Sequence, residues 1–121
     1  MLESNFIAFL NSKFPDIPVF SFEIPQGSPS PSFCFENAGM GIHQQYTNGE
    51  HIEARTIKLT LSSENIKHIY DDGLLHKYIM EVHQMGELSI LNARILNFSD
   101  LFDKENKIYE RTYTISIKYK R

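Results

Sequence analysis

The sequence has 121 residues with a single cysteine, no tryptophan and no long hydrophobic run. The lone thiol of Cys34 has no second cysteine with which to form an internal disulfide, which is typical of a protein from a reducing compartment. The longest apolar stretches are too short for a membrane-spanning helix, and the N-terminus MLESNF lacks the features of a signal peptide. The sequence therefore predicts an intracellular protein with no membrane contact.

Motifs for catalysis, metal binding and cofactor binding are missing too. There is no glycine-rich phosphate loop, no GxSxG nucleophile motif and no pair of cysteines at ligand spacing. The run Asp71-Asp72-Gly73 is typical of a turn, not of an acid/base pair. We therefore predict no metal, no cofactor and no catalytic residues. The sequence has five histidines, and their spacing matches no metal-binding motif: His43, His51, His68, His76 and His83.

The net charge of −3 is small but unevenly distributed along the chain. Residues 1–53 carry a net −5 and residues 54–121 a net +2. Such a split could align copies head to tail, although scattered, solvated charge is the simpler interpretation. The basic residues near the C-terminus alternate with acidic ones, so we expect a solvated face and not a nucleic-acid surface. These basic residues are Lys104, Lys107, Arg111, Lys118, Lys120 and Arg121.

Hydrophobic residues make up 41% of the sequence and charged residues 22%, as in ordinary globular domains. We predict one domain covering residues 1–121, with an organising β-α-β-β unit at 55–121 and an irregular loop or hairpin at 25–53. The last strand gives the clearest pattern, because Tyr113, Ile115, Ile117 and Tyr119 alternate with polar residues. Its apolar side is predicted to face the core and its polar side the solvent.

The organising unit is predicted to contain the strands Arg55–Leu61, Leu88–Phe98 and Tyr109–Tyr119 at the centre of the sheet. A helix should follow the first strand, capped by Ser62 or Ser63 and closed by Gly86. Asp71-Asp72-Gly73 should kink or divide this helix. The apolar pattern slips within the second strand, which indicates a β-bulge. Residues 99–107 should form a charged turn.

The N-terminal part is predicted to begin with an amphipathic helix, Leu2–Lys13, followed by an edge strand, Val19–Ile24. A Pro/Ser loop at 25–32 should lead into a short strand, Phe33–Glu36. Asn48-Gly49 is a favourable hairpin turn, which would let Ile42, Gln44 and Tyr46 pair with His51, Glu53 and Arg55. The fold class is therefore α+β, with an antiparallel or mixed sheet packed by an N-terminal and a central helix, and a projecting β-hairpin or loop.

The order of these elements, together with the closing hairpin DLFDKENKIYERTYTISIKYKR, resembles the tail terminator proteins of long-tailed phages, the lambda-like minor tail family. This resemblance implies an α+β subunit of a hexameric ring that caps the tail tube, ends tail polymerisation and joins the tail to the head connector. The implied partners are copies of the same chain, the tail tube protein and the connector or neck protein, with DNA only passing through the ring. The implied location is the tail or neck of a virion assembled in the host cytoplasm, and the implied activity is structural, without catalysis.

Residues 39–53 carry too little apolar surface to remain ordered alone, so we predict that they become ordered on assembly. The predicted anchors are Ile42, Tyr46 and Ile52, which would fill pockets of a neighbour. Glu50 and Glu53 would then meet Lys118, Lys120 or Arg121 of an adjacent copy or of the tube. A flexible loop without a partner is the alternative for this segment.

Two other functions are compatible with the sequence. One is a head completion or neck connector protein, which would look similar at the level of element order. The other is a small ligand-binding α+β domain or small-molecule enzyme that uses Cys34 with His43 near the loop containing Gly39 and Gly41. We expect Cys34, placed between Phe33 and Phe35, to be a packed hydrophobic residue instead.

Overall fold

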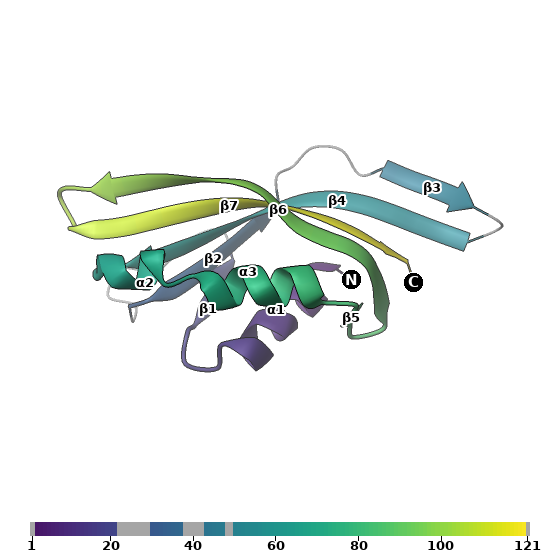
Figure 1. Ribbon diagram of the computed structural model, residues 1–121, viewed down its shortest axis with the longest axis horizontal. Helices are drawn as coiled ribbons and strands as arrows, with labels where there is room; N and C mark the ends of the chain where they lie inside the picture. Colours follow the sequence, from purple (N-terminus) through teal and green to yellow (C-terminus); the bar gives the residue numbers. More distant parts are fainter. Residues whose placement is uncertain (1, 22–29, 38–42, 48–49, 121) are drawn as a thin grey trace.

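The computed structural model describes residues 2–21, 30–37, 43–47 and 50–120, and of residues 37, 43–47, 50 and 51 it describes only the backbone. The chain forms one curled sheet with its helices on one face (Figure 1). The elements are α1 (Leu2–Lys13), β1 (Val19–Ser21), β2 (Ser32–Asn37), β3 (His43–Thr47), β4 (Glu50–Ser63), α2 (Ile66–Tyr70), α3 (Gly73–Glu81), β5 (Gln84–Met85), β6 (Leu88–Asp103) and β7 (Ile108–Lys120).

The strand order is β1-β2-β4-β7-β6-β5, and β3 pairs with β4 on the same edge as β2. Only β1 and β2 run parallel, and every other described pair is antiparallel, so the sheet is mixed. The predicted α+β class is confirmed. The three strands predicted for the centre of the sheet lie side by side as β4, β7 and β6.

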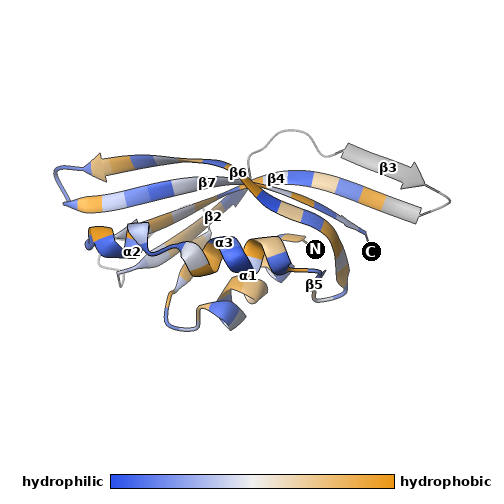
Figure 2. Cartoon of the chain, in the orientation of Figure 1, coloured by the Kyte–Doolittle hydropathy of each residue, from blue (hydrophilic) through white to orange (hydrophobic). Residues whose placement is uncertain are grey.

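The core lies between the sheet and the helices. Ile115 and Ile117 of β7 have no exposed surface, and Tyr113 and Tyr119 have 0% and 2%. Alternation of polar and apolar residues is also visible along β4 in the hydropathy colouring of Figure 2. The predicted inward face of the last strand is therefore confirmed, and the helices cover it with residues spaced three or four apart, as an amphipathic helix requires. These helical core residues are Leu2, Phe6, Phe9, Leu10, Leu75 and Ile79.

The central helix is divided in two, as the sequence predicts, because the chain leaves helical geometry at Asp71 and Asp72. Its predicted cap is wrong. Strand β4 continues through Ser63, and Asn65 caps α2 by accepting a hydrogen bond from the amide of Lys67 at 3.0 Å. The cause is tertiary: Ser62 pairs with both β2 and β7, so the serines are held in the sheet.

The predicted helix end at Gly86 is also wrong. Helix α3 ends at Glu81, and Gly86 occupies the tight turn of the β5–β6 hairpin, where Met85 pairs with Leu88. Gly86 has φ +59°, a conformation that glycine adopts without steric cost. A glycine after an apolar run marks either a helix end or a hairpin turn, and the sequence alone does not separate the two.

The phase slip in the sequence predicts one bulge in this strand, and β6 contains two. Its register with β7 shifts at Leu91 and again at Leu96. Beyond the second bulge β6 runs on to Asp103, so the charged turn is shorter than predicted and spans residues 104–107. Asp103 closes this turn by accepting hydrogen bonds from the amides of Glu105 and Asn106.

Two hairpins project from opposite ends of the sheet (Figure 1). One is β6–β7, and the other is β3–β4, in which Gln44 pairs with Glu53 and Tyr46 with His51, as predicted. The predicted partner of Arg55, Ile42, lies outside the described residues. The chain thus carries one arm at each end.

Candidate assembly surface

The predicted contact residues fall into three groups. Ile42 and Arg121 lie outside the described residues, and Tyr46 and Glu50 are described only as backbone in β3 and β4. Ile52 and Glu53 of β4 stand opposite Lys120 and Tyr119 of β7, and Lys118 stands opposite Ala54. The structure therefore brings Ile52, Glu53, Lys118 and Lys120 together within one chain.

Glu53 is only 6% exposed and accepts a hydrogen bond from the hydroxyl of Tyr119. Burial, reinforced by this carboxylate, raises the pKa of Tyr119 above its usual value. Lys118 is exposed and Ile52 half-buried. Within one chain Glu53 thus helps to fix β4 against β7, at the base of the β3–β4 arm.

Cys34 and His43 are not neighbours. Cys34 is 8% exposed and stands opposite Thr60 of β4, whereas His43 stands opposite Ala54. Six residues of strand separate those two partners, or about 20 Å at the rise of a β-strand. Since a nucleophile and its base must lie within hydrogen-bonding reach, this pair does not form a catalytic dyad.

The outer edge of β6 is the most unusual surface of the described chain. Strand β5 pairs only with Leu88 and Ser89, and no other described strand pairs with this edge between Leu91 and Asp103. An edge of this length, carrying large apolar side chains, is a template for pairing with another chain unless it is covered. Sequence reasoning missed it, because the predicted strand Leu88–Phe98 was no longer than the predicted strand Tyr109–Tyr119. The exposed apolar residues are Leu91, Leu96, Phe98, Leu101 and Phe102, at 42–65%.

A shallow apolar hollow lies beside this edge, between α2 and the β6–β7 hairpin. It has a volume of about 280 Å³, and its lining includes Ile66, Tyr70, Leu101 and Phe102. Tyr70 is 67% exposed, and the rings of Phe102 and Tyr109 stack with their centroids 4.6 Å apart. The edge and the hollow form one apolar area at the end of the molecule.

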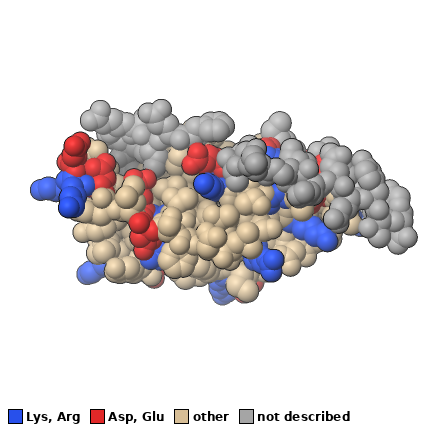
Figure 3. All heavy atoms as spheres, turned by 90° about the horizontal axis from the view of Figure 1, so that it is seen from above, with Lys and Arg blue, Asp and Glu red and all other residues tan. Residues whose placement is uncertain are grey.

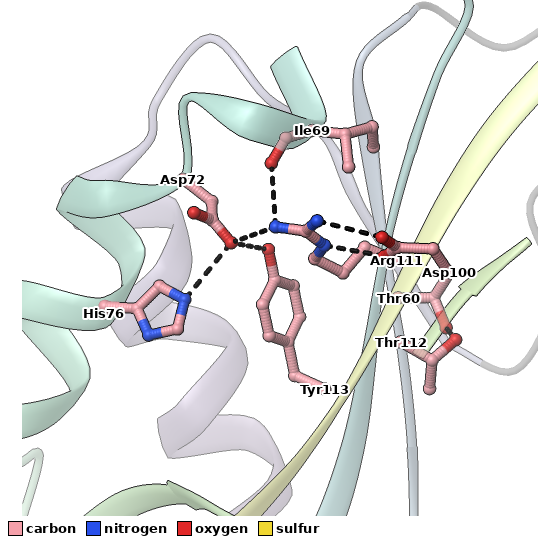
Figure 4. Close-up of polar contacts among 8 residues, drawn as sticks. All are labelled: Thr60, Ile69, Asp72, His76, Asp100, Arg111, Thr112 and Tyr113. Atoms are coloured by element: carbon pink, nitrogen blue, oxygen red, sulfur yellow. Dashed lines mark hydrogen bonds and ion pairs between the residues drawn. The ribbon is translucent and has the colours of Figure 1, made fainter. Parts of the chain in front are cut away.

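A buried arginine supports this area from within (Figure 4). The guanidinium of Arg111 donates to both carboxylate oxygens of Asp100, with Nε–Oδ1 at 2.7 Å and Nη2–Oδ2 at 2.9 Å. It also donates to Asp72 at 3.2 Å and to the carbonyl of Ile69 at 3.4 Å. Arg111 is 8% exposed and lies 4.3 Å from the ring centroid of Phe98. The predicted solvated role for this arginine is therefore wrong.

Asp72 joins the break between α2 and α3 to the same cluster. It accepts hydrogen bonds from the hydroxyl of Tyr113 at 2.6 Å and from His76 Nε2 at 3.1 Å (Figure 4). Burial alone would raise the pKa of Asp72, but the bonds from Tyr113 and Arg111 and the charge of His76 outweigh it and lower the pKa. The bond from Arg111 likewise lowers the pKa of Asp100. These groups satisfy one another, and the cluster ties the β6–β7 hairpin to the break between α2 and α3.

Figure 3 looks onto the face of the sheet opposite the helices. Charged side chains gather at the tip of the β6–β7 hairpin, and a broad area without charge lies beside them. Strands β4 and β7 contribute hydroxyl groups to this face, where the side chains of Thr60 and Thr112 are hydrogen-bonded at 3.0 Å. The open face thus carries hydroxyl groups together with charged side chains such as Lys58 and Lys118.

The described residues contain no cluster of three side chains suited to hold a metal ion. None of the described helices is both long and apolar enough to cross a membrane. The most distinctive surface of the described chain is the uncovered sheet edge with its apolar hollow.

Comparison with known proteins shows a likeness in fold to a solved structure. No protein family model matches the sequence, and no curated protein matches it. Among solved structures, a chain from "Virion of native gene transfer agent (GTA) particle" superposes with a TM-score of 0.64 and 3% sequence identity. The superposition covers 93% of this chain and 84% of that chain. The two chains share a fold over nearly their whole length.

Proposed function

We propose that this chain is a structural protein of a phage-like virion, without enzymatic activity. The observation that carries the proposal is the shared fold with a chain of a gene transfer agent virion, which extends over 93% of this protein. An uncovered sheet edge beside an apolar hollow also supports it, because such surfaces serve contacts between protein chains. The polar cluster around Arg111 is internally paired, which favours support of a surface over catalysis.

Within the virion, we propose the role of tail terminator. The chain would form a hexameric ring that caps the tail tube, ends tail polymerisation and offers a surface for joining to the head. The order of elements that resembles the lambda-like family supports this role. Two arms at opposite ends of one sheet fit a ring, since each copy could reach one neighbour on either side.

Electron microscopy of the purified protein tests both the role as a virion structural protein and the formation of a ring. We expect rings with a central hole, formed alone or on addition of the tail tube protein, and a mass by light scattering that rises with concentration. A strict monomer at every concentration, with and without tube protein, would contradict ring formation. Rings that bind the neck protein but not tail tubes would instead identify a head completion protein.

The contact residues proposed for the β3–β4 arm can be tested by hydrogen exchange. We expect amides 39–51 to exchange rapidly in the free protein and to become protected in the ring, whereas Ile52 and Glu53, which also pair with β7, should be protected in both. The physical reason is that Ile42, Tyr46 and Ile52 would then be anchored in a neighbour, with Glu50 facing the basic end of β7, Lys118–Arg121. Protection already present in the monomer, or absent from the ring, would show that the arm has no part in assembly.

A further inference from the structure

Within the described residues, β3 and the part of β6 from Leu91 onward each have a strand edge that pairs with no other strand. We propose that the outer stretch of β6, Asn97–Asp103, receives strand β3 of a second copy of this chain, so that the two sheets continue into one. This inference rests on the proposed function, which supplies the ring of several copies. It adds which two strand edges would join neighbouring copies. Strand addition of this kind supplies main-chain hydrogen bonds for affinity and side-chain contacts for specificity.

The receiving edge is regular only beyond the bulge at Leu96. From there β6 and β7 pair residue by residue, from Asn97 opposite Thr114 to Asp103 opposite Ile108. The outward amide and carbonyl groups of these seven residues have no strand partner within the described chain. Phe98 and Phe102 lie along the same stretch and are 48% and 42% exposed. An added strand would therefore gain backbone hydrogen bonds and cover aromatic surface together.

The donating edge lies on the other side of the same sheet. Strand β3, His43–Thr47, pairs with β4 along one edge, and no described strand pairs with its other edge. Its sequence HQQYT contains no carboxylate, so it would bring no like charge to Asp100 and Asp103. The other edge strand on that side, Val19–Ser21, is only three residues long. Strand β3 is the better match in length.

Strand direction agrees with this pairing. Strands β6, β7, β4 and β3 are antiparallel each to the next, so β3 runs opposite to β6. If every copy in a ring faces the same way, β3 of one copy meets β6 of the next as an antiparallel pair. Each copy then uses one donor and one acceptor, and a head-to-tail contact of this type repeats until the ring closes. The two arms point in opposite directions, so neighbouring sheets would be staggered, as tilted strands are in a barrel.

Pairing of β6 with itself is the main competitor, and the charges disfavour it. The two-fold arrangement that pairs all seven residues is centred on Asp100, which places two copies of this carboxylate directly opposite each other. Like charges at opposed positions destabilise a strand pair. This arrangement would also end at two copies and leave β3 uncovered.

Disulfide trapping tests the contact in the full chain. The buried native thiol is first removed by Cys34→Ala, and Gln45→Cys is then combined in turn with Asn97→Cys, Ser99→Cys or Leu101→Cys to sample the registers. Under mild oxidation we expect at least one of these double variants to form a ladder of covalent oligomers, because each copy carries both halves of the contact. Each single-cysteine variant should remain uncrosslinked.

The matched control combines Gln45→Cys with Lys58→Cys, since Lys58 is exposed in β4, between β2 and β7 and away from every sheet edge. Equal crosslinking in this control would mean random collision and overturn the proposal. Covalent dimers of a variant that carries Ser99→Cys and Leu101→Cys but keeps Gln45 would show that β6 pairs with itself, because these two positions face each other in the arrangement centred on Asp100. Rings without a ladder would reject the edge contact and keep the ring, whereas a ladder without rings would keep the contact and reject the ring.

Discussion

Truncating Ile115 to alanine is expected to lower the free energy of unfolding by about 2–5 kcal/mol, measured by urea denaturation at pH 7. Ile115 has no exposed surface and lies in the middle of β7, directly between Ile57 of β4 and Ile95 of β6. The loss comes from the removed apolar contacts and from the cavity that the surrounding strands cannot fill.

The matched control is Thr114→Ala, the preceding residue on the opposite face of β7. Thr114 is half-buried, and its truncation leaves no closed cavity, so we expect a change of about 0.5 kcal/mol. Equal losses for the two variants would mean that the faces of β7 are assigned the wrong way round, and with them the side of the sheet on which the helices lie.

Replacing Arg111 by alanine is the second large change that we expect, with a loss of about 3 kcal/mol in unfolding free energy. The substitution removes the guanidinium from the carboxylate of Asp72, which keeps only its bonds with Tyr113 and His76, and the side chain of Asp72 is only 11% exposed. The value lies at the lower end for a broken buried pair, because the other partner, Asp100, is 49% exposed and can be hydrated. Chemical denaturation at pH 7 measures it.

Arg94→Ala is the control, because Arg94 is an exposed arginine of the same hairpin and should change stability by less than about 0.5 kcal/mol. The pH dependence provides an independent check. The lowered pKa values of Asp72 and Asp100 stabilise the fold above their unfolded values near 4, and this contribution is lost as the pH falls. In Arg111→Ala, the free energy of unfolding should therefore fall less steeply as the pH is lowered below about 4. An unchanged slope would show that Arg111 does not hold the two carboxylates.

The parts of the fold that the sequence predicts well are those with an uninterrupted local pattern. Tyr113 to Tyr119 alternate strictly, and the buried residues are the predicted ones because a period of two allows only one choice of face. Asp71-Asp72-Gly73 divides the helix because three poor helix formers in succession outweigh its apolar stripe. The predicted phase slip after Ile95 likewise corresponds to a real insertion in the strand, at Leu96.

The parts that the sequence misses depend on distant partners. Ser62 is an acceptable helix cap locally, yet strands on both sides keep it in the sheet. Arg111 lies in a sequence rich in charge, and nothing nearby in the chain indicates that it turns inward towards Asp72, 39 residues away. The uncovered edge of β6 is equally invisible, because whether a strand has one neighbour or two is decided by topology and not by its own residues.

The two bulges of β6 also bear on how the length of this strand can change. Leu91 and Leu96 are the extra residues, with no counterpart on β7, so removing either one would leave the inward and outward positions of the remaining strand unaltered. Removing one residue between Asn97 and Phe102 would instead move the following side chains to the opposite face of the sheet, as far as the bulge at Leu96 or the turn at 104–107. Insertions and deletions in this arm should therefore accumulate at Leu91, Leu96 and the turn at 104–107, while the stretch between Asn97 and Asp103 keeps a fixed number of residues.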